Sequence, residues 1–251
     1  MERFKIGRYD VGQGLFTIWS QLYDEHLQSK ESQFSTKLKD ELLSIIEWQQ
    51  YLVDRQYIFS ILEKKIDVEE NTHNLVAKIF LKIPKRSELL KESFPQFDAT
   101  EAKLSRNAIE IGEIIMQSSK EALEWHAFVQ YSELWFGGAV HSTLIKKIIR
   151  KNLLWQKAYF DNADGITNLF ENIKKLKDVK NRKIKDEYLL LDKITAFWSV
   201  GGNFTEKIDF ISEYFNLLSE KVDNYSRVSI DNATYFCKDA FNLFNRLMEN
   251  I

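Results

Sequence analysis

Glycine and proline are scarce in this sequence, and their scarcity decides the fold class. The 251 residues include only nine glycines and two prolines, Pro84 and Pro95. Average proteins contain about 7% glycine and about 5% proline, and sheet proteins use such residues to turn between short strands. Long helices with few breaks are the natural alternative, so the sequence predicts an all-α protein.

Apolar residues recur at three- and four-residue spacing along most of the chain, as expected for helices with one buried face. We therefore expect an irregular bundle of about eight helices. Residues 1–18 differ, because apolar residues alternate from Phe4 to Val11 before two glycines, a pattern typical of a short extended arm. The expected organisation is an N-terminal arm over 1–18 and one helical domain over 19–251, with a sub-boundary near 84–98.

Capping residues and glycines predict where several helices begin and end. One stripe of apolar residues predicts a helix of about 30 residues over 38–66. Asp98, with Glu101 three residues later, has the pattern of a capping box and opens a run that extends to the Gly-Gly pair at 137–138. Glycine often follows a helix C-terminus, so we expect that run to stop there. Asp231 is expected to open the last helix.

The single cysteine and the lack of long apolar segments indicate the compartment. Cys237 cannot form an intramolecular disulfide, and no stretch of about 18 uncharged apolar residues occurs. The first ten residues also lack the apolar core of a signal peptide. We expect a cytoplasmic protein that does not span a membrane, and the sequence leaves its oligomeric state open.

Charge is distributed unevenly, although the whole chain carries a net charge of only −2. Residues 137–185 contain twelve Lys and Arg against four Asp and Glu, whereas the segments 98–136 and 186–251 are acidic. A cationic surface attracts phosphate backbones without sequence preference. The candidate nucleic-acid-binding residues are Lys146, Lys147, Arg150, Lys151, Lys174, Lys175, Lys177, Lys180, Arg182, Lys183 and Lys185.

A second interpretation of the basic segment needs no ligand. Lysines near a helix C-terminus interact favourably with the helix dipole, and they can pair with acidic helices of the same fold. No helix-turn-helix spacing, zinc finger or RNA-recognition signature accompanies the charge.

Few residues are suited to metal or cofactor binding. The chain has four histidines, and the one Glu-x-x-His pair, Glu70 and His73, has no second copy, although helical di-iron sites use two. Phosphate-binding and dinucleotide-binding glycine motifs are absent. The sequence therefore predicts neither a metal site nor a cofactor.

Three hypotheses about function follow. The leading one is a non-enzymatic helical protein that binds another protein, because no catalytic set is complete and the charged segments are segregated. The second is nucleic-acid binding through 137–185. The third is an enzyme whose site is assembled from distant residues, namely Glu110, Glu113, Glu124, His126 and His141. The Lys-, Ile-, Asn- and Phe-rich composition resembles that of AT-rich microbial genomes, where small helical proteins often serve defence.

Overall fold

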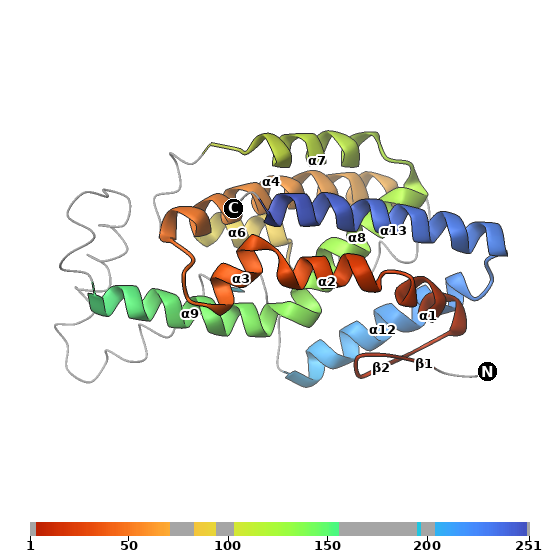
Figure 1. Cartoon of the computed structure of the whole chain (residues 1–251). Helices are drawn as coiled ribbons and strands as arrows, with labels where there is room; N and C mark the ends of the chain where they lie inside the picture. Colours follow the sequence, from red (N-terminus) through yellow and green to blue (C-terminus); the bar gives the residue numbers. More distant parts are fainter. Residues whose placement is uncertain (1–3, 71–82, 94–102, 156–194, 197–203, 250–251) are drawn as a thin grey trace.

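A computed structural model describes residues 4–70, 83–93, 103–155, 195–196 and 204–249. These residues form a bundle of α-helices with one small hairpin at the N-terminal end, so the predicted all-α class is confirmed (Figure 1). The helices are α1 (Gln13–Ser20), α2 (Tyr23–Glu31), α3 (Gln33–Lys39), α4 (Ile45–Glu70), α6 (Arg86–Ser93), α7 (Arg106–Gln117), α8 (Lys120–Ser132), the π-helix η3 (Glu133–Gly137), α9 (Gly138–Trp155), α12 (Phe204–Val222) and α13 (Arg227–Met248).

The N-terminal hairpin accounts for the alternating apolar residues at the start of the chain. Strands β1 (Phe4–Ile6) and β2 (Tyr9–Val11) pair antiparallel, and the turn between them contains Gly7 with a φ of 61°, which glycine adopts without strain. The ring of Tyr9 stacks on Phe215 of α12, with centroids 5.4 Å apart. The extended part ends before α1 begins at Gln13, inside the expected arm.

The helix expected over 38–66 is divided into two. Helix α3 ends at Lys39, and α4 begins at Ile45. Glu41 between them has a φ of 59°, a left-handed conformation that interrupts a right-handed helix. The sequence pattern missed this break because the apolar spacing continues through the turn.

Serine caps decide where several later helices begin. The hydroxyl of Ser105 accepts a hydrogen bond from Ala108 N at 3.1 Å, and that of Ser119 accepts one from Ala122 N at 3.2 Å. Each bond satisfies a donor that the first turn of a helix leaves without an internal partner. The run expected from 98 is therefore two helices, α7 and α8, within the described residues; residues 98–101 lie outside them. Likewise, Ser226 caps α13, so the last helix begins before Asp231.

The expected helix stop at the Gly-Gly pair is wrong. Gly137 closes the π-helix η3 and Gly138 begins α9 with helical dihedrals, so the chain from α8 to α9 continues through the pair. The backbone is close to a side chain here, because a Cβ placed on Gly137 would lie 3.2 Å from Cε1 of His141. Glycine thus allows close packing inside a helix at this position.

The core lies where α13 crosses α8 and where α4 contacts α6 and α7, while α13 also contacts α2 (Figure 1). Its largest fully buried side chains include Trp48, Tyr51, Phe59, Trp125 and Phe128. Among the helices that the structure describes, none combines the length and apolarity needed to cross a membrane.

Candidate functional site

Among the described histidines, His26 has a partly exposed imidazole that could bind a ligand. It lies on α2, whose first turn contains Asp24 and Glu25, acidic residues that favour a helix N-terminus. The ring is half-buried between two aromatic rings, with centroid distances of 5.4 Å to Trp19 and 6.5 Å to Phe241. The ring nitrogens of His26 make no hydrogen bond to the described residues, although its backbone N–H donates to the backbone oxygen of Leu22.

Burial lowers the pKa of His26, and the charge of Lys30, one turn later in α2, lowers it further. The imidazole is therefore neutral at physiological pH. The neutral ring is the form that binds metal ions, because a protonated nitrogen has no lone pair to donate.

A second cluster of polar side chains is buried between α4 and the π-helix. We call it the Arg55 cluster, and it comprises Tyr51, Arg55, Gln130, Glu133 and His141. Arg55 has no exposed surface; its Nη2 lies 3.3 Å from Oε2 of Glu133, and its Nη1 also donates to the side chain of Gln130. Nδ1 of His141 lies 3.0 Å from Oε1 of Glu133, so one carboxylate joins α4 to α9. π-Helical turns of this kind are frequent at functional sites.

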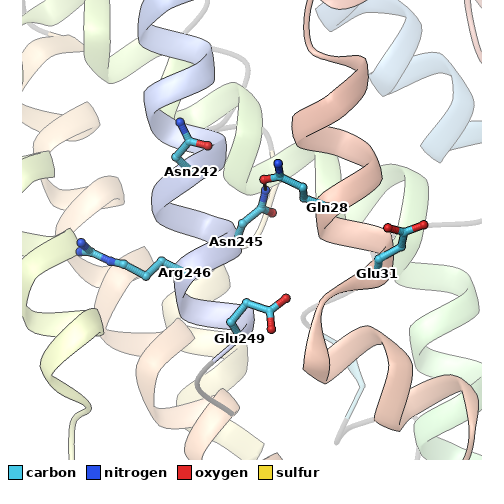
Figure 2. A pocket seen from close by; sticks show the side chains of 6 residues that line it. All are labelled: Gln28, Glu31, Asn242, Asn245, Arg246 and Glu249. Carbon is cyan, nitrogen blue, oxygen red and sulfur yellow. Dashed lines mark hydrogen bonds between the residues drawn. The ribbon is translucent and has the colours of Figure 1, made fainter.

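A groove of about 420 Å³ lies between α2 and α13 (Figure 2). Its lining is polar throughout, formed by Gln28, Glu31, Asn242, Asn245, Arg246 and Glu249. Binding sites for large cofactors are mostly apolar with a few polar groups, so the groove does not suit such a molecule. Its buried residue, Asn245, is engaged in hydrogen bonds to α2.

The five residues of the enzyme hypothesis do not converge. Glu110 is on the surface of α7, where it pairs with Arg246 at 3.0 Å, and Glu113 is exposed on the same helix. Glu124 is buried beside Lys221, and His126 is enclosed in the core with a pKa lowered by burial to about 4. Within the described part of the chain no three His, Cys, Asp or Glu residues are placed to hold a metal ion.

Most of the candidate nucleic-acid-binding residues lie outside the described residues. Lys146 and Lys147 are on α9, and Lys147 forms an ion pair with Glu41. Arg150 and Lys151 belong to the same helix, but their side chains are not described. The residues Lys174, Lys175, Lys177, Lys180, Arg182, Lys183 and Lys185 are in the segment 156–194, outside the described ranges.

Two of the solved structures that share this fold are heme oxygenases. Heme oxygenase-2 from Synechocystis sp. PCC 6803, solved in complex with heme and NO, superposes with a TM-score of 0.68 at 12% identity, over 94% of this chain and 84% of that one. Heme oxygenase from Leptospira interrogans superposes with a TM-score of 0.56 at 16% identity, over 95% of this chain and 99% of that one. No protein-family model and no curated protein matches the sequence.

These likenesses correct the leading interpretation of the sequence. The chain has the helical fold of heme oxygenases. This likeness to enzymes contradicts the prediction of a non-enzymatic protein that binds a macromolecular partner. The predictions of protein binding and of nucleic-acid binding conflict with the likeness to the same two heme oxygenases. Segregated charge was misleading because part of it pairs within the fold, as Lys147 does with Glu41.

Proposed function

We propose that this chain is a heme-binding enzyme in which His26 would hold the iron. The fold is that of enzymes whose names and bound ligand specify heme, over nearly the whole chain. The observation that carries the proposal within this chain is the neutral, half-buried imidazole of His26 between Trp19 and Phe241.

The other candidate ligands fit iron less well. His126 is only 3% exposed, so a porphyrin cannot reach its ring without opening the core. The side chain of His141 is 17% exposed and belongs to the Arg55 cluster, where Glu133 and the ring of Phe34 contact it. Burial raises the pKa of the Cys237 thiol well above its usual value, and a metal ligand must be a thiolate. Among the described histidines, His26 is therefore the partly exposed imidazole whose ring makes no hydrogen bond to another described residue.

Bound heme would supply an iron centre for oxygen chemistry, which no protein side chain provides. The residues around His26 have simpler roles. His26 would donate a nitrogen lone pair to the iron, and the rings of Trp19 and Phe241, packed near the imidazole, would limit its rotation and exclude water from its faces. Burial, assisted by the charge of Lys30, lowers the pKa of His26 and so favours the unprotonated imidazole that is able to donate.

Titration of the purified protein with hemin, followed by visible absorption, tests the proposal. The wild-type protein should bind one equivalent, and His26→Ala should weaken binding by more than about tenfold, since even outer-shell partners of metal ligands contribute that much. Added imidazole should restore the spectrum of the wild-type complex. His126→Gln is the matched control, because it removes an imidazole from the core and should leave the spectrum unchanged. Equal binding and equal spectra for His26→Ala and wild type would contradict the assignment.

The enzymatic part of the proposal has its own test. With ascorbate as the reductant and dissolved oxygen as the oxidant, the absorption band of the bound heme should decay in the wild-type protein. Catalase should be present to remove free hydrogen peroxide, which bleaches heme without the protein. Decay no faster than that of the His26→Ala protein under the same conditions would reject heme oxidation and leave only binding.

We also propose a cytoplasmic location. Cys237 is a buried free thiol, which fits a reducing compartment. Fractionation of cells that express the tagged protein would test this, and recovery in a secreted or membrane fraction would contradict it.

A further inference from the structure

The turn of α2 that contains His26 is fastened to α13 by one buried amide. Asn245 is 7% exposed, and its Nδ2 donates to the backbone oxygen of Glu25 at 3.0 Å and lies 3.4 Å from Oε1 of Gln28. Its Oδ1 accepts a hydrogen bond from the hydroxyl of Ser29. Figure 2 shows Asn245 between the two helices, with its amide beside Gln28.

The three α2 residues that Asn245 contacts flank His26 along the chain. Glu25 precedes it, and Gln28 and Ser29 follow in the next turn. A helix that is held at these positions can neither rotate about its axis nor slide along α13 without losing a hydrogen bond. The direction of the His26 side chain is therefore coupled to the amide of Asn245.

Other residues of α13 support the same turn. Lys238, Phe241 and Asn245 are three and four residues apart, so they lie on one face of the helix. Lys238 pairs with the carboxylate of Glu25 at 3.4 Å, and Phe241 faces the imidazole of His26. Of these three residues, Asn245 is the one whose side chain bonds to the backbone of α2.

From this arrangement we infer that Asn245 is a positioning residue for His26, the histidine proposed to hold the iron. Its amide holds the His26 turn against α13, so that the imidazole keeps one orientation when it binds iron. The inference rests on the proposed function, because it concerns the ligand named there. Outer-shell groups that orient a metal-binding histidine commonly change metal affinity when they are removed.

The chain offers a closely matched control for the test. Asn242 is on the same helix and lines the same groove, but its side chain is exposed and makes no hydrogen bond to the described residues. Asn245→Ala and Asn242→Ala therefore remove the same group from neighbouring positions of α13. Ser29→Ala removes only the hydroxyl that donates to Oδ1 of Asn245. This variant replaces Asn245→Ala in the test if circular dichroism shows that Asn245→Ala does not fold.

Two measurements on the heme-loaded proteins report the state of the ligand. One is the rate at which heme leaves to excess apomyoglobin, and the other is the iron–histidine stretching band of the reduced form in resonance Raman spectra. Asn245→Ala should release heme about tenfold faster and broaden or shift the band, and Ser29→Ala should act in the same direction. Asn242→Ala should change neither. A residue with a structural role alone would lower the melting temperature without altering the band of the fully loaded protein.

The double variant His26→Ala with Asn245→Ala separates the two proposals. If Asn245 acts through His26, the second substitution should not accelerate heme loss further in the His26→Ala background. If His26→Ala weakens heme binding but Asn245→Ala and Ser29→Ala behave like Asn242→Ala, the positioning role is wrong and the proposed function stands. If wild type and His26→Ala bind heme alike, both proposals fail.

Discussion

The guanidinium of Arg55 and the carboxylate of Glu133 meet at 3.3 Å inside the helical bundle, where Arg55 has no exposed surface. The rings of Phe59 and Phe244 lie 4.7 Å and 5.2 Å from the guanidinium carbon, so water cannot replace a lost partner. The pair connects α4 to the π-helix, and His141 contacts the other oxygen of the same carboxylate. One buried charge pair therefore holds three helical segments in register.

Replacing Glu133 should destabilise the protein severely. Glu133→Gln leaves the charge of Arg55 buried without a counter-ion, and removing one member of a buried pair costs about 3–5 kcal/mol. The free energy of unfolding, measured by urea denaturation followed by circular dichroism, should fall by that amount. Glu110→Gln is the control, because Glu110 pairs with arginines on the surface and such pairs contribute about 0–1 kcal/mol. Equal losses of stability for the two variants would show that the charge of Arg55 is not buried away from water.

The buried histidine of α8 predicts how stability depends on pH. Burial lowers the pKa of His126 to about 4, whereas in an unfolded chain it is near 6.5. Between these values the unfolded chain binds a proton that the folded protein excludes, so stability is complete above pH 6.5 and falls as the pH decreases toward 4. A difference of this size corresponds to about 3 kcal/mol. His126→Gln should remove most of this decline between pH 7 and pH 4.5 in urea titrations, and an unchanged decline would assign it to other groups.

The helical stripes could be predicted from the sequence, but several helix ends could not. Stripes over α4, α7 and α12 follow from side-chain spacing, which reports burial directly. The breaks depend on one residue each, such as the left-handed Glu41 and the capping hydroxyls of Ser105 and Ser119. The Gly-Gly pair at 137–138 has the pattern of a helix stop, but here the helix continues and the side chain of His141 packs closely against Gly137, a contact that the pattern does not reveal.

The candidate site was not predicted because its parts are distant in sequence. His26 was not singled out, since no spacing motif surrounds it and its aromatic neighbours come from α1 and α13. Nothing in the sequence distinguishes Asn245 from other polar residues, because its contact with α2 forms only when α13 packs against α2. The only available signal was Trp19 seven residues before His26, which becomes meaningful only once α1 and α2 are known to turn toward each other.

The ion pair between Lys221 and Glu124 predicts a second dependence on pH. The carboxylate of Glu124 is only 2% exposed, and burial raises its pKa despite the nearby ammonium group of Lys221. Lys221→Met should raise the pKa of Glu124 further, so the folded variant retains a proton that the unfolded chain releases. The loss of stability should therefore be small near pH 5 and grow to about 1–3 kcal/mol near pH 8. This loss is smaller than that expected for a fully buried pair, because solvent screens the partly exposed Lys221.

Urea denaturation of Lys221→Met at pH 5 and pH 8, against wild type at each pH, measures this effect. Lys5→Met provides the control, because Lys5 pairs with Asp10 where both side chains are largely exposed. That substitution should cost little at either pH. If Lys221→Met were equally destabilised at both pH values, the loss would come from packing of the lysine stem and not from the charge of Glu124.

Asp223 fastens the N-terminal segment to the end of α12, and its replacement should loosen that segment. Its Oδ1 accepts a hydrogen bond from Gly14 N at 2.8 Å, so it caps α1, whose own N-cap residue Gly12 has no side chain. Asp223→Ala should cost about 1–2 kcal/mol and speed hydrogen exchange at the first amides of α1. Asp209→Ala, an exposed change within α12, should do neither.

The side chain of Asp223 also leaves no room for a side chain at position 12, because a Cβ on Gly12 would lie 1.9 Å from Oδ2 of Asp223. Gly12→Ala should therefore lower the free energy of unfolding more in the wild-type background than in the Asp223→Ala background. Additive losses in the double variant would contradict this contact.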